Sequence, residues 1–385
     1  MKILFQTRFD SFKNTGGDTL QLLKTKEELE KLGCEVVIDC NYKINLSTFD
    51  IVHVFQLDWT PEPYLQALNA KRQGKKIVVS PIHHSEKEVV EFEERVRYNF
   101  RILANMFLKK QEQRDVLKNI YRSVFDTRKL YPTLLSVIEG FRNEQRSVLK
   151  FSDAVLVQTR KELEDIKRDF EIDVYAKGFV IPNGVGEKFF LTEQRSQAHE
   201  TQVLGDGYFL TVGRIEPRKN IIAIVNAVDS LRKKSNLDLN LVVVGAMNKN
   251  NWDYYYHFLS RIKGMSFVKH VERVPYDNMP GLYRKAKVYV SASFFETSGL
   301  TLLEAAVCGC QVVARNGDTG ERVREYLLDF PFYCDPFSMA SISDALYEAL
   351  NSKKKTFSPL GIEKFKWSAV AKETLSIYNG LIGRA

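Results

Sequence analysis

The segment YFLTVGRIEPRKN, residues 208–220, decides the fold, because an alternation of apolar strands with helices begins here for the second time in the chain. Its first half is a continuous apolar run, which is typical of a strand buried on both faces of a parallel sheet. Similar runs follow at 239–246, 267–274, 287–293, 310–315 and 332–335. Helical segments separate them, so this part of the chain predicts a doubly wound α/β domain.

The same alternation occupies the chain before this segment. Apolar runs lie at 2–7, 35–39, 50–55, 76–82, 154–159 and 179–184. We expect helices at 18–32 and 62–72 between them, and 385 residues are too many for one ordinary core. The sequence therefore predicts two Rossmann-like domains at 1–185 and 186–364, with the cleft between them as the expected ligand site.

Composition excludes several classes of protein. The chain is 44% hydrophobic and 27% charged, as in ordinary globular proteins, and no apolar run is long enough to cross a bilayer. Its five cysteines match no zinc spacing. These features predict a cytoplasmic protein in a reducing compartment, without a signal peptide.

Positive charge is concentrated in one part of the chain. Residues 95–130 hold ten Lys or Arg against three acids, an excess of seven in a protein of net charge +8. The segment belongs to a helical insertion at 86–150 in the first domain, and the plainer interpretation is a solvated insertion. The sharper one is a docking surface for an anionic acceptor or membrane, and we predict peripheral binding to anionic lipid. No nucleic-acid partner is expected, since no recognised reader motif accompanies the charge.

The strand at 208–215 ends in a basic loop. Gly213 lets a ligand approach the backbone, Arg214 and Lys219 follow, and we expect Lys219 and Asn220 to open the next helix. Two cations beside a helix N-terminus would bind a phosphate group without a Walker sequence. The alternative is ordinary surface cations at the end of a strand.

Two glutamates flank a Gly-containing turn in FETSGLTLLEAAVCGC, residues 295–310. We expect a helix to begin near Ser298, so that first-turn N–H groups can meet a phosphate oxygen. Carboxylates only accept hydrogen bonds and therefore suit vicinal hydroxyls, which Glu304 could bind on one sugar and Glu296 on a second. The alternative is a capped surface helix with incidental acids.

Together these segments resemble a family 4 retaining glycosyltransferase of the GT-B fold. The resemblance rests on FETSGLTLLEA, GRIEPRKN, VIPNGV at the domain junction and an early Gly-Gly loop. FKWSAVAKETLSIY, within 365–385, also resembles that family's closing helix, which crosses back to the first domain. The similarity covers nearly the whole chain outside 86–150. It implies two Rossmann-like domains facing across a cleft, with a nucleotide-sugar donor domain at 186–364 and an acceptor domain at 1–185.

The resemblance also implies roles for residues. Arg214 and Lys219 would bind the donor diphosphate, Glu296 the transferred sugar and Glu304 the nucleotide ribose. The donor-binding residues as a set would be Gly16, Gly17, Gly213, Arg214, Lys219, Val274, Gly299, Leu300, Thr301 and Glu304. Either His83 or His84 would lie near the sugar and the attacking hydroxyl, and the sequence leaves that choice open.

The implied activity is hexosyl transfer from a UDP- or GDP-sugar to a glycan or lipid-linked acceptor, as in surface polysaccharide or glycolipid synthesis. The donor's anomeric configuration is retained in this family. No cofactor is implied, and no metal is needed if Arg214 and Lys219 stabilise the leaving diphosphate. Two alternatives stay open: a nucleotide-sugar epimerase of the same architecture, and a non-catalytic protein that binds nucleotide sugars or anionic glycans.

Overall fold

The computed structural model describes residues 1–13, 16–58, 61–96, 130–191, 205–235, 238–357 and 361–383. It divides into two compact units, each described by itself below: unit 1 is Met1–Gly184 with Glu363–Ala385, and unit 2 is Val185–Ile362. Most of the basic segment at 95–130 lies outside the described residues.

Unit 1 is built on a six-stranded parallel sheet of order β2-β1-β3-β4-β5-β6. Its strands are β1 Lys2–Gln6, β2 Glu35–Ile38, β3 Ile51–Phe55, β4 Lys76–Ser80, β5 Ala154–Val157 and β6 Gly178–Val180. Its helices are α1 Gly17–Lys31, α2 Glu62–Arg72, α3 Glu86–Arg95, α6 Leu130–Glu139, α7 Phe141–Phe151, α8 Arg160–Phe170 and α17 Trp367–Leu381. All six expected strands form, so the predicted sheet is confirmed for this unit.

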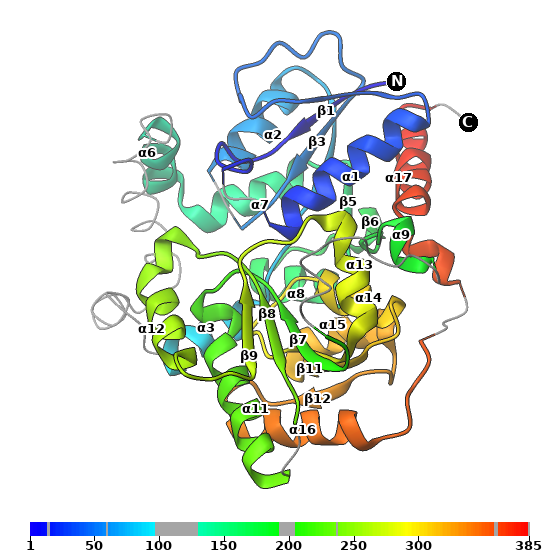
Figure 1. Ribbon diagram of the computed structural model, residues 1–385. Helices are drawn as coiled ribbons and strands as arrows, with labels where there is room; N and C mark the ends of the chain where they lie inside the picture. Colours follow the sequence, from blue (N-terminus) through cyan, green and yellow to red (C-terminus); the bar gives the residue numbers. More distant parts are fainter. Residues whose placement is uncertain are drawn as a thin grey trace. The chain divides into compact units, whose positions relative to one another are not determined.

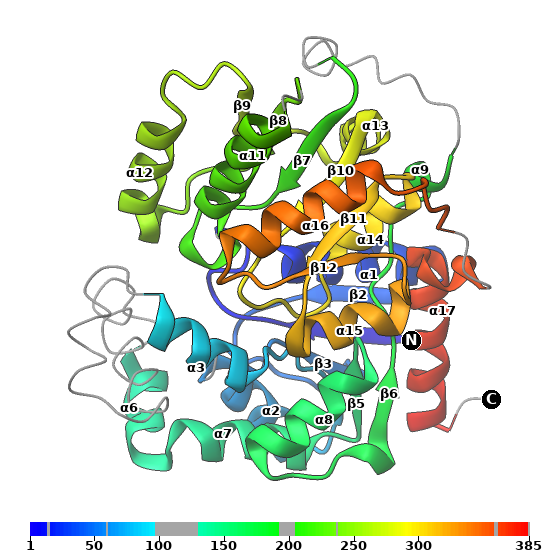
Figure 2. The same ribbon diagram turned by 90° about the horizontal axis from the view of Figure 1, so that it is seen from below.

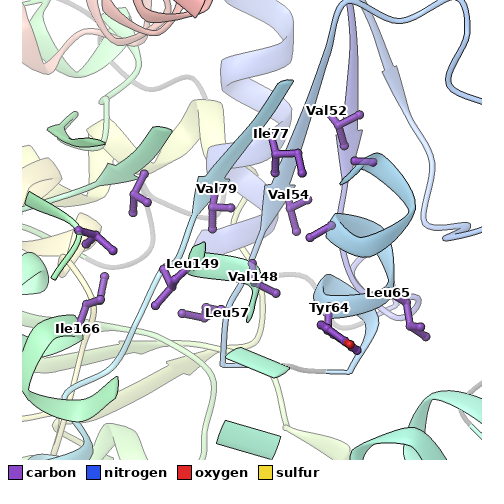
Figure 3. Packing of buried hydrophobic residues seen from close by; sticks show 14 of the residues in the cluster. Val52, Val54, Leu57, Tyr64, Leu65, Ile77, Val79, Val148, Leu149 and Ile166 are labelled. Carbon is purple, nitrogen blue, oxygen red and sulfur yellow. The ribbon is translucent and has the colours of Figure 1, made fainter. Parts of the chain in front are cut away.

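Alternate residues of each strand enter opposite layers of unit 1, as the two-residue period of a strand requires. Val52 and Val54 of β3, with Ile77 and Val79 of β4, pack toward α2, α7 and α8 (Figure 3). Phe5, Ile51 and Val78 face the other way, toward α1 and α17. Both faces of the sheet are therefore covered, which explains why its strands are apolar throughout.

The last helix, α17, lies beside α1 in unit 1 (Figure 1). Its Tyr378 is fully buried, and the hydroxyl lies 2.6 Å from Nδ1 of His53, whose Nε2 is 2.9 Å from Oγ of Ser80. Burial lowers the pKa of His53 to about 3, so the ring is neutral and uses one nitrogen as donor and one as acceptor. This buried chain of hydrogen bonds fastens the C-terminal helix to the sheet of unit 1.

Unit 2 repeats the architecture with the strand order β12-β11-β10-β7-β8-β9, again entirely parallel. Its strands are β7 Tyr208–Val212, β8 Leu241–Val244, β9 Val268–Val271, β10 Ala286–Ser291, β11 Gln311–Arg315 and β12 Phe332–Cys334. Its helices are α9 Glu187–Phe190, α11 Ile221–Ser235, α12 Trp252–Ile262, α13 Met279–Lys285, α14 Leu300–Val307, α15 Gly317–Leu327 and α16 Met339–Asn351. Counted from β7, this is the Rossmann order, and the chain reverses direction across the sheet between β7 and β10.

Helix boundaries were predicted less well than the existence of the helices. The helix at 62–72 is confirmed, and α1 begins and ends one residue before the expected 18–32. In the described part of the 86–150 insertion the chain forms α3, α6 and α7. No helix among the described residues is both long enough and apolar enough to cross a membrane.

Candidate active site

The reversal in strand order gives unit 2 a natural ligand edge. β7 and β10 are neighbours, and their carboxyl ends lead into the loops 213–220 and 292–299. Ligands of open parallel sheets bind where two such loops separate. The loops are joined by the backbone, because N–H of Phe294 donates to the carbonyl of Arg218 over 2.9 Å. All of the candidate residues that were singled out in these two segments therefore lie at one edge of one sheet.

The basic loop does not open directly into a helix. Residues Pro217–Lys219 form a single 3₁₀ turn, and Asn220 adopts a left-handed conformation with φ of 57°. The Asn220 side chain donates to the carbonyl of Pro336 over 2.7 Å, and α11 begins only at Ile221. The prediction that Lys219 and Asn220 open the helix was wrong, because this buried amide fixes a kink before it.

Gly213 and Lys219 pack against each other within the loop. A Cβ atom at Gly213 would lie 3.3 Å from Cδ and Cε of Lys219. The absent side chain thus leaves room for the lysine stem to cross the end of β7. Two of the candidate residues, Gly213 and Lys219, therefore lie together at this strand end.

Lys219 and Arg218 both contact Glu296. Nζ of Lys219 donates to Oε1 of Glu296, and Nη1 of Arg218 donates to Oε2 over 3.2 Å. Burial alone would raise the pKa of Glu296, but the two cations lower it to about 2. Burial lowers the pKa of Lys219, and Glu296 opposes that shift. Glu296 is therefore a carboxylate held by two cations, one of which, Arg218, was not predicted.

Arg214 has a different environment from Lys219. Its side chain is 40% exposed, and Nη2 lies 3.8 Å from Oε1 of Glu216. Glu216 is buried and accepts from Nη2 of Arg218 over 3.1 Å, so it is shared by two arginines. The structure does not bring Arg214 onto Glu296, but it leaves the guanidinium accessible to an anion at the same loop.

Several groups fasten the backbone around Glu296. Its N–H donates to Oγ1 of Thr319 over 3.0 Å, and the buried Arg322 donates to its carbonyl over 3.3 Å. The hydroxyl of Tyr326 donates to the carbonyl of Ser298. All three partners come from α15, so this helix positions the turn between the two glutamates.

Helix α14 begins at Leu300, two residues later than the expected start near Ser298. Gly299 caps it in a left-handed conformation with φ of 56°, and a Cβ there would lie 2.7 Å from Cδ1 of Leu302. Thr301 accepts a hydrogen bond from the Tyr289 hydroxyl over 2.7 Å. The first N–H groups of a helix have no partner inside it, so this turn presents donors suited to a phosphate oxygen.

Glu304 is buried in α14 and only 3% exposed. The hydroxyl of Tyr283 donates to its Oε2 over 3.0 Å. Burial raises the pKa of Glu304 to about 7, although the hydroxyls of Tyr283 and Tyr276 pull it down. The two glutamates of the motif therefore differ near pH 7. Glu296 is held as a carboxylate, whereas Glu304 is divided between its carboxylate and its protonated form. Val274 is half-buried in the chain between β9 and Tyr276.

The early glycines lie at the carboxyl end of the sheet in unit 1. Gly16 is the N-cap of α1 and Gly17 is its first residue. Asp18, which follows them, forms an ion pair over 3.0 Å with Arg8, and the Arg8 side chain is buried. The acidic residue after the Gly-Gly loop is thus explained by a buried partner, Arg8, which lies two residues after the end of β1.

The histidine pair follows β4 in unit 1, and its members differ. His83 is 2% exposed, and its ring lies 2.6 Å from Oδ1 of Asp58 and 2.9 Å from Oδ2 of Asp169. Although burial opposes the charge, the two aspartates raise the pKa of His83 to about 10. His84 is partly exposed, and its Nδ1 lies 3.0 Å from Oδ2 of Asp58. Sequence reasoning missed both aspartates.

No group of three or more His, Cys, Asp or Glu side chains in the described ranges could hold a metal ion. In the cluster of Asp58, His83 and Asp169, a carboxylate oxygen lies within hydrogen-bonding distance of each nitrogen of the imidazole. With a pKa of about 10, the ring is an imidazolium near neutral pH, and both nitrogens act as donors. His83 therefore balances the aspartates by its own charge.

The part of the chain that matches a known protein family lies within unit 2. Residues 193–358 match the family model described as glycosyl transferases group 1. O-antigen chain mannosyltransferase B of Escherichia coli is 28% identical over 182 residues, which cover 46% of this chain and 47% of that protein. The chain thus spans about half the length of this curated relative.

Two solved structures match along the whole chain. Sucrose-phosphate synthase from Thermosynechococcus elongatus has a TM-score of 0.70 at 15% identity, covering 100% of this chain and 99% of that one. Anabaena Alr3699/HepE in complex with UDP and glucose has a TM-score of 0.64 at 15% identity, covering 100% and 98%. These likenesses confirm the predicted GT-B fold of two Rossmann-like domains. Through residues 193–358, the chain is similar to the group 1 glycosyl transferases.

Proposed function

We propose that the protein is a retaining hexosyltransferase that moves a sugar from a UDP- or GDP-sugar to a glycan or lipid-linked acceptor in surface polysaccharide or glycolipid synthesis. The observation that carries the proposal is the cluster of Glu296 with Lys219 and Arg218, which lies beside the start of α14 at the strand reversal of unit 2. This edge combines cations, free helix N–H groups and carboxylates, as a sugar diphosphate requires.

In this proposal unit 2 binds the donor. Arg214 and Lys219 bind the diphosphate, and the backbone N–H groups at Gly299, Leu300 and Thr301 bind its oxygens. Glu296 accepts hydrogen bonds from the transferred sugar, because its charge is fixed by Lys219 and Arg218. Glu304 binds the ribose, and the chain at Val274 lies near the base. Gly16 and Gly17 of unit 1 allow close approach to the diphosphate.

The chemistry follows from where charge develops. Breaking the glycosidic bond leaves positive charge on the sugar and negative charge on the diphosphate. Cations and helix N–H groups that are already fixed in place stabilise the leaving diphosphate without reorganising. Glu296 is not assigned as a nucleophile, since both its oxygens already accept hydrogen bonds from Lys219 and Arg218. A diphosphate oxygen would take the acceptor's proton.

Of the two histidines, we assign His84 to the acceptor side of the reaction. His83 is a buried imidazolium between two carboxylates and has no proton-accepting nitrogen at neutral pH. His84 is partly exposed, and Asp58 accepts from both its backbone N–H over 2.9 Å and its ring. His84 would contact the sugar or the attacking hydroxyl, with Asp58 as its positioning residue.

The names of similar proteins support the donor and acceptor classes of this proposal. The E. coli relative is an O-antigen chain mannosyltransferase, and the HepE structure contains UDP and glucose. We therefore favour a glycan or lipid-linked acceptor and a location on the cytoplasmic side of the membrane, with peripheral attachment.

The first test is a thermal-shift panel of UDP, GDP, ADP, TDP and CDP with the wild-type protein and Arg214→Ala. At about one hundred times Kd, the correct nucleotide should raise Tm of unit 2 by about 5–10 °C. Arg214→Ala should lose most of this shift, because its exposed guanidinium binds the diphosphate. Lys234→Ala, which removes an exposed cation from α11, is the control and should keep the shift.

Absence of any shift with all five nucleotides would contradict the proposal. Incubation of the preferred donor without acceptor separates the alternatives, because an epimerase would release a new nucleotide sugar. Turnover with any acceptor would exclude a purely binding protein.

A second test uses the titration of Glu304. Its pKa is about 7 without ligand, and ribose hydroxyls that donate to it favour the carboxylate. Nucleotide binding at pH 7 should therefore release up to about half a proton per site. Glu304→Gln should abolish this release and weaken binding by about 10- to 100-fold, as for a lost hydrogen bond to a charged group. Calorimetry in buffers of different ionisation enthalpy measures both quantities.

Glu348→Gln is the matched control, since Glu348 is exposed on α16 and should change neither quantity. Equal proton release by wild type and Glu304→Gln would remove Glu304 from the ribose site.

A further inference from the structure

Helix α6, Leu130–Glu139, exposes the kind of side chains that a helix normally buries. Its buried residues are Pro132, Thr133 and Ser136, which are small or polar. Its exposed apolar residues are Leu130 at 46%, Tyr131 at 55%, Leu134 at 62%, Val137 at 55% and Ile138 at 81%. A solvated surface helix has the opposite arrangement, with apolar residues toward the core.

The orientation of α6 is fixed by contacts on its polar side. Helix α6 packs on α7 in unit 1 (Figure 2), and Oγ of Ser136 donates to Oε2 of Glu144 over 2.6 Å. Glu144 is buried, and burial raises its pKa to about 8. The helix cannot turn its apolar side inward without breaking this buried hydrogen bond.

The exposed residues form one continuous stripe. Positions 130, 131, 134, 137 and 138 follow the spacing that places side chains on a single helix face. Scattered exposed apolar residues are ordinary on soluble proteins, but a contiguous group of five marks a surface that meets a partner. We call these five residues the α6 face.

The chemistry around the α6 face favours a lipid surface as this partner. Tyr131 stacks on Tyr42 with ring centroids 6.5 Å apart, and Nζ of Lys43 lies 5.9 Å from the Tyr131 ring. Tyrosine and lysine beside aliphatic side chains are typical of helices at a membrane–water boundary. In the sequence, the cationic segment 95–130 leads directly into this helix, and its excess of seven positive charges suits anionic headgroups.

We propose that α6 lies along an anionic bilayer, with the α6 face inserted among the upper acyl chains. Such helices bind in the plane of the interface without crossing the membrane. The inference deepens the peripheral attachment proposed above by naming the surface that makes it. It does not depend on the transfer reaction, and binding to vesicles can be measured without any donor or acceptor.

The test is flotation of the full chain with vesicles of phosphatidylglycerol and phosphatidylcholine. The variant Leu134→Ser/Val137→Ser/Ile138→Ser removes the three most exposed aliphatic side chains of the α6 face and should lower partitioning by on the order of tenfold or more. The control Trp252→Ser/Tyr256→Ser removes two aromatic side chains of α12 that are 60% and 59% exposed, and it should float like the wild type. Vesicles of phosphatidylcholine alone should bind the wild type more weakly.

Four outcomes would overturn the proposal. The first is a wild type that does not float, and the second is a triple variant that floats equally well. The third is equal loss by the α12 control, which would indicate general adsorption. The fourth is a result obtained without vesicles. A wild-type dimer that becomes a monomer in the triple variant, or a large fall in the Tm of the triple variant, would show that protein covers the α6 face. Loss of flotation with nucleotide binding retained would separate this inference from the proposed function.

Discussion

Lys219→Ala should lower turnover of the donor about 10²- to 10³-fold, which is the usual loss when one preorganised donor to a developing negative charge is removed. The partly buried ammonium group contacts Glu296 beyond the end of β7 and would face the leaving diphosphate. The effect should appear in kcat, because the charge on the diphosphate grows as the bond breaks. Release of nucleoside diphosphate with water as acceptor measures it without knowledge of the natural acceptor.

Two variants make this result interpretable. Lys233→Ala removes a lysine whose side chain is 75% exposed on α11, and it should leave turnover unchanged. Lys219→Arg keeps a cation but changes its shape, so it should recover only part of the activity. A loss smaller than about tenfold in Lys219→Ala would show that Arg214 and Arg218 suffice. The leaving-group role of Lys219 would then be rejected.

The fold was predictable because its signals are local. Continuous runs such as 208–212 and 286–291 are apolar because both faces of each sheet are covered by helices. Each strand can therefore be recognised from its own residues. The start of α11 was not predictable in the same way. It depends on the left-handed Asn220, whose side chain reaches the carbonyl of Pro336, 116 residues away.

The residues of the candidate site also divide into those with a local sequence signal and those that depend on distant contacts. Glu296, Lys219 and Gly299 could be chosen because they lie in short segments at strand ends, where ligand-binding residues gather. Arg218 is adjacent to Lys219, but no feature of the sequence indicates that it also contacts Glu296. Its two carboxylate partners, Glu216 and Glu296, become apparent only when the two loops are brought together.

The state of His83 was beyond sequence reasoning for the same reason. Its partners are 25 and 86 residues away: Asp58 lies in the loop after β3, and Asp169 lies in the last turn of α8. Only the fold of unit 1 brings them together. A pair of adjacent histidines therefore gave no basis for choosing between them. The structure separates them by burial and by the number of carboxylates that each one contacts.

His83→Gln should lower the free energy of unfolding of unit 1 by about 3–5 kcal/mol near pH 7, the usual result of removing one member of a buried ion pair. Asp58 and Asp169 would then lose the imidazolium between them, which, together with Arg168, lowers the pKa of Asp169 to about 2 against the cost of burial. Denaturant unfolding followed by a probe in unit 1 measures the change.

The dependence on pH distinguishes charge from packing in this experiment. The pKa of His83 is about 10 in the folded protein against 6.5 for an ordinary histidine, so its contribution is complete below pH 6.5 and is lost as pH rises toward 10. The wild type should lose stability over this interval, and His83→Gln should not. His84→Gln, the control, leaves His83 between its aspartates and should keep the wild-type slope. If His83→Gln also keeps that slope, the ring is neutral when folded, and His83 becomes as suitable a proton acceptor as His84.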